Sequence, residues 1–548
     1  MPSIGRAAGV CSAFPEPSER VLAAAPVGTT AAPQPGSRPW TPLTQALDRF
    51  HNGAHRFSSE QMMHLLAPAV TQLETRLRLG AEGVEDLLAT DFRGLSIVPA
   101  RESTLRDDSV FRIWNSEWAG PQAPAASPQE FAGLLQQYLA PHAPLTLADL
   151  ACLATLGSPE DQPASIHTRL RFELAGPVVT GSKRTWQATG VWQIEWNRDD
   201  TSWKIAAWRP IEMVTVEGPE AVFRDVTEAA FASDPTYRTH LLRDTNYWRS
   251  SLDKASGVDI FGNSGVSVGD ADGDGRDEIY LCQPQGLPNR LYRQRSPGVF
   301  EDFALQAGVD VLDNTSMALF ADLLNRGRQD LIVITETSPV LFLNNGNGRF
   351  TLKRDAFPPG AVQAALTGAA MADYDRDGYL DLYVCAYGYV EGEGSTLPCP
   401  YYDAHNGPPN RLFHNQGDGT FVDVTTASGL DRGNDRFSFA CAWNDVDDDG
   451  WPDLAVVNDF GRNNLYRNLR NGTFAEVMDA LPGFGSGMSA AFADFNGDGR
   501  ADLYVSNMWV PAGERVTADA GFRQRLQDLP RDLVRQFAMG NAFYANTG

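Results

Sequence analysis

The stretch "DADGDGRDEIYLC", residues 270–282, has aspartate at its first, third and fifth positions, glycine at its sixth and glutamate at its ninth. An apolar, β-branched run comes directly after it. Three further stretches repeat this pattern with aspartate at position nine, and the last has asparagine at position three: "DYDRDGYLDLYVC" (373–385), "DVDDDGWPDLAVV" (445–457) and "DFNGDGRADLYVS" (494–506). A degenerate copy, "DLLNRGRQDLIVI" (322–334), keeps the first aspartate, the glycine and the ninth-position aspartate. The copies begin 52, 51, 72 and 49 residues apart, so they define a repeat with one long insertion.

A second motif recurs between these loops. It reads "NRLYRQRSPGVFEDF" (289–303), "LFLNNGNGRFTL" (341–352), "NRLFHNQGDGTFVDVT" (410–425) and "NNLYRNLRNGTFAEV" (463–477). A glycine-bearing turn between two alternating apolar runs predicts a β-hairpin. With a run of small and apolar residues before most of the loops, every unit is expected to hold four strands. Four-stranded units at this period favour a β-propeller over a linear β-solenoid, whose periods are usually shorter.

The spacing of oxygens in the acidic loops predicts Ca²⁺ binding. Side chains at positions one, three, five and nine and the carbonyl at position seven face a common centre, which supplies the hard oxygen ligands that Ca²⁺ takes. About four ions are expected. The predicted ligands are Asp270, Asp272, Asp274, Arg276, Glu278; Asp373, Asp375, Asp377, Tyr379, Asp381; Asp445, Asp447, Asp449, Trp451, Asp453; and Asp494, Asn496, Asp498, Arg500, Asp502. The alternative is that these loops are solvated Asx turns without an ion.

Two other calcium-binding modules share this loop and are excluded by the residues on its C-terminal side. An EF-hand needs glutamate at position twelve and flanking helices. Here position twelve is Leu281, Val384, Val456 or Val505, inside a strand-like run. Dockerin modules continue into a helix, which the same runs contradict.

The degenerate loop tests this interpretation from within the chain. Leu324 and Arg326 replace the ligands at positions three and five. We therefore expect no calcium there, and we expect the guanidinium to lie beside Asp322 and Asp330 in place of the cation.

Composition limits the partners of this 548-residue chain. A formal charge of −24 argues against binding to nucleic acid or to anionic membrane surfaces, because both require basic patches. No apolar run is long enough to predict a transmembrane helix. Residues 1–41 are rich in Ala, Pro, Ser and Gly without a hydrophobic signal region, so we interpret them as a disordered leader or linker.

Residues 42–216 predict a smaller α+β domain. Helical periodicity in "EQMMHLLAPAVTQLETRL" and "PQEFAGLLQQYLA" predicts amphipathic helices between about Pro42 and Leu156, and three antiparallel strands are expected from Ile166 onward. This order resembles the nuclear-transport-factor-like cone, with low specificity. Five tryptophans are expected mainly in the core, with a ligand cavity as the alternative: Trp186, Trp192, Trp196, Trp203 and Trp208. A metal site at His51, His55 and His64 is disfavoured, because no third-ligand motif accompanies the pair at i and i+4.

Residues 222–548 resemble the FG-GAP, or VCBS, repeats of integrin-α-like proteins. "PCPYYDAHNGPPNRLF", "SNMWVPAGERVTADAGFRQRL" and "RQFAMGNAFYANTG" are similar to bacterial members of the cartilage acidic protein family. The resemblance implies a secreted, surface or periplasmic scaffold, stabilised by calcium, that binds a protein or glycan ligand or mediates adhesion. The ASPIC/UnbV module that often follows the repeats in this family is not found here.

The ends of the repeat region suggest two alternatives. "VFRDVT" at 222–227 matches the last strand of a unit, and joined to the fifth unit it would close a ring of five blades. Alternatively the chain is a fragment and the propeller is incomplete at its C-terminus, which the end inside a hairpin favours.

The insertion at 387–415 supports an alternative function. Cys399, His405 and His414 could form a soft-metal or redox site beside Tyr401, Tyr402 and Asp403. The chain would then be a polysaccharide-active enzyme or a metal-dependent oxidase. We favour a non-catalytic scaffold, because this cluster has no known ligand spacing and the chain has no nucleophile elbow or P-loop. Cys385 and Cys399 are expected either to form a disulfide or to remain two free thiols.

Overall fold

The computed structural model describes residues 58–95, 99–118, 126–157, 164–200, 202–219, 223–243, 265–360, 364–388, 402–477, 485–509 and 540–548, with the short stretches 247–248, 398–400, 480–483 and 535–537 and a few single residues between these ranges. The chain divides into two compact units. Among the described residues, one unit contains 58–224 with 513, 515 and 517, and the other contains 225–509 and 535–548. The chain is mainly β.

The first unit is a curved sheet with helices packed on it. The strands pair in the order β2-β3-β7-β6-β5-β4, and β1 pairs in parallel with β7. Their bounds are β1 Leu88–Gly94, β2 Arg101–Asp107, β3 Arg112–Glu117, β4 Leu147–Gly157, β5 Ser165–Pro177, β6 Arg184–Asp199 and β7 Ser202–Pro219. The helices are α2 Ser58–Arg78 and α3 Pro128–Leu139, with short 3₁₀ turns η2 Val84–Leu87 and η3 Ala140–His142.

The helices form as their periodicity predicts. On α2, apolar side chains from Met62 to Leu77 recur at helical spacing and are buried against the sheet. Helix α3 begins after Ser127, whose hydroxyl accepts the Glu130 N–H and satisfies one of the free donors of the first turn. The three strands expected after Ile166 are confirmed as the hairpins β5-β6 and β6-β7.

Two parts of the helical prediction are wrong. Residues 88–117 contain β1, β2 and β3, and residues 147–157, rich in Ala and Leu, form β4. Strand β4 pairs with β5 along its whole length, so sheet pairing overrides the helical preference of its residues. Strand β2 is almost wholly exposed and therefore lacks the alternation by which a strand is recognised.

The tryptophans of this unit lie in its core. Four of them, Trp186, Trp192, Trp196 and Trp208, are buried, and Trp203 is partly buried against the same cluster. Trp196 donates its indole N–H to Thr168 Oγ1 at 2.9 Å. The predicted His51–His55 pair lies outside the described residues.

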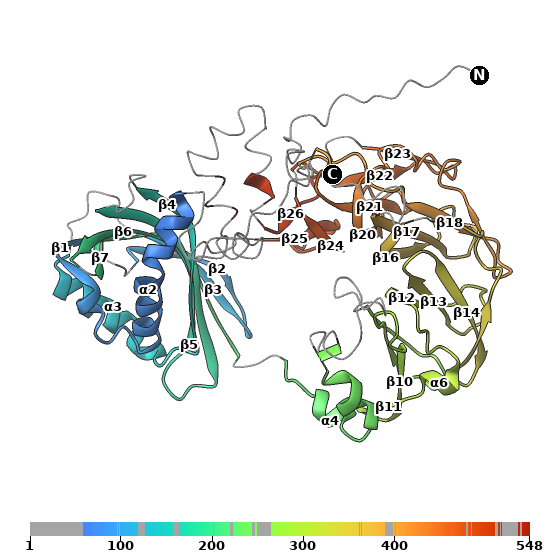
Figure 1. Ribbon diagram of the computed structural model, residues 1–548, viewed down its shortest axis with the longest axis horizontal. Helices are drawn as coiled ribbons and strands as arrows, with labels where there is room; N and C mark the ends of the chain where they lie inside the picture. The colour runs from blue at the N-terminus through green and yellow to red at the C-terminus, as the bar shows by residue number, and fades with distance from the viewer. Residues whose placement is uncertain are drawn as a thin grey trace, which may run out of the picture. The chain divides into compact units, whose positions relative to one another are not determined.

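The second unit consists of five consecutive antiparallel sheets, coloured from green to red in Figure 1. Their orders are β11-β10-β9-β8, β12-β13-β14-β15, β16-β17-β18-β19, β20-β21-β22-β23 and β24-β25-β26. The bounds are β8 Val266–Gly269, β9 Glu278–Leu281, β10 Arg290–Ser296, β11 Val299–Asp302; β12 Thr315–Ala321, β13 Asp330–Thr335, β14 Pro339–Gly346, β15 Arg349–Lys353; β16 Ala365–Ala372, β17 Asp381–Gly388, β18 Arg411–Asn415, β19 Phe421–Asp423; β20 Phe437–Asn444, β21 Asp453–Asp459, β22 Asn464–Asn468, β23 Phe474–Glu476; and β24 Gly487–Ala493, β25 Asp502–Asn507, β26 Ala542–Tyr544.

The first strands of successive sheets lie next to one another, β8 by β12, β12 by β16, β16 by β20 and β20 by β24. Small residues permit this approach. A Cβ on Gly368 of β16 would lie 2.7 Å from the carbonyl oxygen of Phe439 on β20, so only glycine fits there. Apolar clusters fill the space between neighbouring sheets, and Phe350, Phe421 and Phe474 from the outer hairpins pack into them.

The stretch 222–227 is not a strand in its described part. Residues 223–226 are irregular, and helix α4 (Thr227–Phe231) comes after them. The Asp225 carboxylate accepts the backbone N–H of Thr227 at 2.8 Å, which turns the chain into the helix. A π-helical turn, η4 (Tyr237–Leu241), comes next, and a short helix α6 (Ala304–Ala307) lies after β11. Among the described helices, none is long and apolar enough to cross a bilayer.

Candidate functional site: five acidic loops between paired strands

Each acidic loop joins the first two strands of a sheet, and its ninth residue begins the second strand. Position twelve lies inside that strand in every loop, as the sequence predicts. The ninth-position residues are Glu278, Asp330, Asp381, Asp453 and Asp502, and each is at most 1% exposed. The loops are therefore anchored by a buried carboxylate at the start of a central strand.

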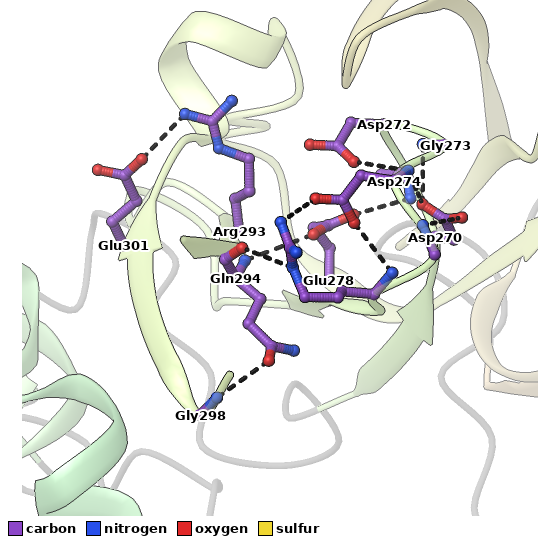
Figure 2. Close-up of polar contacts among 12 residues, drawn as sticks. Asp270, Asp272, Gly273, Asp274, Glu278, Arg293, Gln294, Gly298 and Glu301 are labelled. Carbon is purple, nitrogen blue, oxygen red and sulfur yellow. Dashed lines mark hydrogen bonds and ion pairs between the residues drawn. The ribbon is translucent and has the colours of Figure 1, made fainter. Parts of the chain in front are cut away.

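The first-position aspartate folds the loop around itself. In loop one, Asp270 Oδ1 accepts the N–H groups of Gly273 and Asp274 at 2.8 and 3.1 Å, and Oδ2 accepts that of Gly275 at 3.0 Å (Figure 2). Asp494 makes the same three bonds in loop five, at 2.7, 3.1 and 2.8 Å. A ring of inward-pointing N–H groups thus fixes the turn whatever occupies its centre.

The fifth-position carboxylate accepts the N–H of position seven in all four intact loops. The donors are Arg276, Tyr379, Trp451 and Arg500, and every distance is 2.9 Å. These are the residues whose carbonyls the sequence assigns as ligands. The bond closes the turn at the point where such a carbonyl ligand is expected.

Carboxylate oxygens gather closely in three of the loops. The groups Asp270, Asp272 and Glu278; Asp373, Asp375 and Asp377; and Asp445, Asp447 and Asp453 each offer ligand atoms within 4.8 Å of one another. In loop five Asn496 holds position three and donates to Asp498 at 3.1 Å. Such crowding of like charge is costly unless protons or cations neutralise it.

The pKa values of the buried carboxyls express that cost. Burial, with the neighbouring aspartates, raises the pKa of Glu278 to about 7 and that of Asp453 to about 6. Burial raises the pKa of Asp381 to about 7 and also raises that of Asp375. One oxygen of Asp375 is buried without a hydrogen-bond partner. Without a cation, these four carboxyls therefore hold a proton more readily than free carboxyls do.

Loop two has the same backbone and a cation of its own. Asp322 accepts the N–H groups of Arg326 and Gly327 at 2.8 and 2.6 Å, as its counterparts do. The guanidinium of Arg326 contacts the buried carboxylate of Asp330 at 2.6 Å. The prediction that this guanidinium lies beside Asp330 is confirmed.

One asparagine in each of the last four hairpins has a role that was not predicted from the sequence. The backbone N–H groups of Asn344, Asn415, Asn468 and Asn546 donate to the ninth-position carboxylates of their own sheets at 2.7–2.9 Å. Their side-chain amides donate to the second-position carbonyl of the preceding loop, on Ala271, Leu323, Tyr374 and Val446, at 2.7–2.9 Å. The recurring Asn before each glycine turn was the available signal.

The insertion does not assemble the predicted soft-metal site in its described part. His414 lies in loop three, whereas no metal-ligand cluster of the described residues includes His405 or Cys399. His405 Nδ1 lies 3.2 Å from Asp435, and Arg436 donates to Asp403 at 2.6 Å. Ion pairs thus hold the described part of the insertion against the sheets.

Neither alternative for Cys385 and Cys399 is right, because Cys399 is disulfide-bonded but not to Cys385. Cys385 is a free thiol on β17, fully buried in an apolar cluster that also includes Cys441. Burial raises the pKa of this thiol well above its ordinary value.

Comparisons with known proteins agree with the repeats. A model of the FG-GAP-like repeat family matches residues 322–384 and 445–505. Cartilage acidic protein 1 of Mus musculus and of Homo sapiens are each 26% identical over 304 residues, which is 51% of this chain and 44% or 43% of theirs. The chain therefore spans less than half the length of these relatives.

Solved structures align more weakly. An Agrocybe aegerita lectin that recognises non-reducing terminal N-acetylglucosamine aligns with 45% of this chain and 63% of its own, at 17% identity and a TM-score of 0.27. An NTF2-like protein of Rhodospirillum rubrum aligns with 26% of this chain and 95% of its own, at 18% identity and a TM-score of 0.18. The chain thus contains FG-GAP-like repeats, and it is similar to cartilage acidic protein 1 over about half of its length.

Proposed function

We propose that the repeat unit is a calcium-stabilised β-propeller that acts outside the cytoplasm as a scaffold for a protein or glycan ligand. Loops one, three, four and five each hold one calcium ion through the oxygens at positions one, three, five, seven and nine. The ion neutralises the crowded carboxylates and releases the protons they would otherwise keep. Calcium thereby converts a repulsive turn into a clamp between two strands.

The observation that supports this most directly is loop two. Its sequence lacks two anionic positions, and at this loop a guanidinium contacts the ninth-position carboxylate. The backbone of the loop is otherwise unchanged. Loop two keeps the turn of the other loops although an arginine replaces one of their acidic residues. This turn is therefore compatible with a positive charge at its centre. In loops one and four, arginines pair with aspartates at position three or five, and we infer that a calcium ion from solution neutralises the carboxylates that remain.

Two further observations support the propeller and its location. The first strands of consecutive sheets adjoin in chain order, as they do around a propeller axis. Extracellular calcium modules work at submillimolar to millimolar calcium, the range in which loops of this kind can fill. The family relation, which covers about half of the chain, favours a binding or adhesion role over catalysis.

Metal analysis tests the proposal. The full chain is stripped with chelator, dialysed against 1 mM CaCl₂ and analysed for bound metal, and its melting temperature is measured in calcium, magnesium and chelator. We expect about four calcium ions, a large loss of thermal stability in chelator and poor rescue by magnesium, whose octahedral geometry does not suit these turns. Bound calcium below one ion per chain, or equal stability in calcium and chelator, would refute it.

A binding screen addresses the scaffold role. Glycans and candidate proteins are presented to the full chain in calcium and in chelator. A ligand that binds in calcium and is released by chelator supports the proposal. Turnover of a glycan substrate would instead establish the enzymatic alternative.

A further inference from the structure

Loop three differs from the other loops in having an imidazole among its carboxylates. His414, on β18, places Nδ1 3.1 Å from Asp381 Oδ1 and 3.5 Å from Asp375 Oδ2. Its Nε2 lies 3.9 Å from Asp377. The side chain is 21% exposed, and the ring of Tyr374 meets it edge-on at a centroid distance of 6.2 Å. Positions three, five and nine of the loop thus surround one histidine.

The corresponding residues of the other repeats cannot bind a metal ion in this way. The register of the hairpins aligns His414 with Arg467, because Phe413 pairs with Leu382 as Tyr466 pairs with Leu454. Arg467 pairs with Asp447 and has no lone pair to donate to a metal. The other residues at this position are Arg293, which pairs with Glu301 at 2.9 Å, Leu343 and Ala545.

The donor set of loop three matches a different class of cation. Asp375, Asp381 and His414 offer two carboxylate oxygens and one nitrogen within 4.8 Å of one another. Calcium takes oxygen ligands, whereas imidazole with carboxylates suits Zn²⁺ and its neighbours in the first transition row. A buried oxygen of Asp375 has no hydrogen-bond partner, so the cluster has an acceptor available for an ion.

We propose that loop three is a mixed nitrogen–oxygen site that binds a borderline divalent metal such as Zn²⁺ in preference to calcium, through Asp375, Asp381 and His414 Nδ1. The histidine binds as the neutral tautomer with its proton on Nε2, toward Asp377. This inference rests on the proposed cation-binding role of the loops and narrows the ion at one of them. Loops one, four and five, which have no imidazole at this position, remain calcium sites.

The test uses the metal-free full chain and two reciprocal variants. H414R gives loop three the residue of loop four, and R467H gives loop four the residue of loop three. Each protein is titrated with Zn²⁺ by calorimetry in 1 mM CaCl₂, and bound calcium and zinc are counted afterwards. Co²⁺ is used in parallel as an absorbing probe, and X-ray absorption of the zinc-loaded chain reports nitrogen ligands.

We expect the wild-type chain to bind one zinc ion and keep its calcium at the other three loops. H414R should weaken that zinc binding at least tenfold without changing the calcium of those three loops, and R467H should add a second zinc site. H414Q, which is closer in size to histidine, should also lose the nitrogen signal, and its melting curve in calcium shows whether it folds.

Three results separate this inference from the proposed function. Zinc that binds equally to wild-type, H414R and H414Q proteins overturns the inference, because its site lies elsewhere. No zinc binding, with calcium at all four loops, also overturns the inference and leaves the proposed function intact. No calcium at any loop refutes the proposed function itself, whatever zinc does.

Discussion

The guanidinium of Arg326 contacts the ninth-position carboxylate of loop two, where we expect an ion in the other loops. Replacing Arg326 therefore measures how much a positive charge in this turn contributes to the free energy of unfolding. The side chain is 31% exposed, and its partner Asp330 is fully buried with one oxygen that has no hydrogen-bond partner. Removing one member of a buried ion pair costs about 3–5 kcal/mol. The partial exposure of the arginine reduces this, and we expect R326M to lower the free energy of unfolding by about 2 kcal/mol.

In the double variant L324D/R326D, calcium binding should recover the unfolding free energy that is lost when Arg326 is removed. It supplies carboxylates at positions three and five of loop two, so the loop gains the ligand pattern of its neighbours. An ion at a free concentration of 100 times its dissociation constant contributes about 2.7 kcal/mol, which is close to what the guanidinium provides. We therefore expect L324D/R326D to be less stable than wild type in chelator and to match it within about 1 kcal/mol in calcium.

Denaturant unfolding of the full chain, monitored by a signal from the repeat unit, measures the free energy of unfolding. Metal analysis of the same proteins counts the bound calcium ions. L324D/R326D should bind one calcium ion more than wild type, and R326M should bind the same number. The matched change L324N/R326M supplies no new charge and should stay destabilised in calcium. An unchanged ion count in L324D/R326D, or wild-type stability of R326M in chelator, would refute the interpretation of loop two.

Three other outcomes are expected. In chelator, stability should fall as the pH rises from about 4 to about 7, because the raised pKa values of Glu278 and Asp381 let the folded chain keep protons that the unfolded chain releases; melting curves in calcium should lose this trend. N468A removes amide bonds to the carbonyls of Tyr374 and Pro452 and should cost about 2–3 kcal/mol in denaturant unfolding, whereas N345A, whose exposed amide bonds only Thr351, should cost under about 0.5 kcal/mol. R515A removes a bidentate bond to Glu60 at 2.8 and 3.0 Å and should lower the melting temperature of the first unit, while the exposed change R209A leaves it unchanged.

Much of the repeat unit could be predicted because its signals are local. The aspartate spacing, the glycine turn and the apolar run after it lie within thirteen residues, so strand, loop and strand are specified together. The ion pair between Arg326 and Asp330 was also predictable, because both residues belong to one turn. The paired hairpins could be predicted from their glycine-bearing turns.

The features that the sequence did not reveal depend on contacts between distant segments. Strand β4 is rich in Ala and Leu and is a strand only because β5 pairs with it. His414 lies 33 residues from Asp381 in the chain, so its place among the loop carboxylates depends on the register of β17 and β18. Arg515, which follows β25 in the chain, bonds Glu60 of α2, 455 residues away, and no local pattern marks this contact.

The asparagine bonds between consecutive sheets bear on how such a chain can change in length. Each of these hydrogen bonds joins one asparagine amide to one backbone carbonyl. The carbonyl belongs to Ala, Leu, Tyr or Val in the four cases, so the bond does not depend on the side chain of that residue. The bond also does not depend on the number of residues between the loop and the hairpin. The long insertion after β17 leaves the bonds of Asn415 and Asn468 in place. A duplicated repeat would therefore carry both the asparagine and the carbonyl that this bond requires.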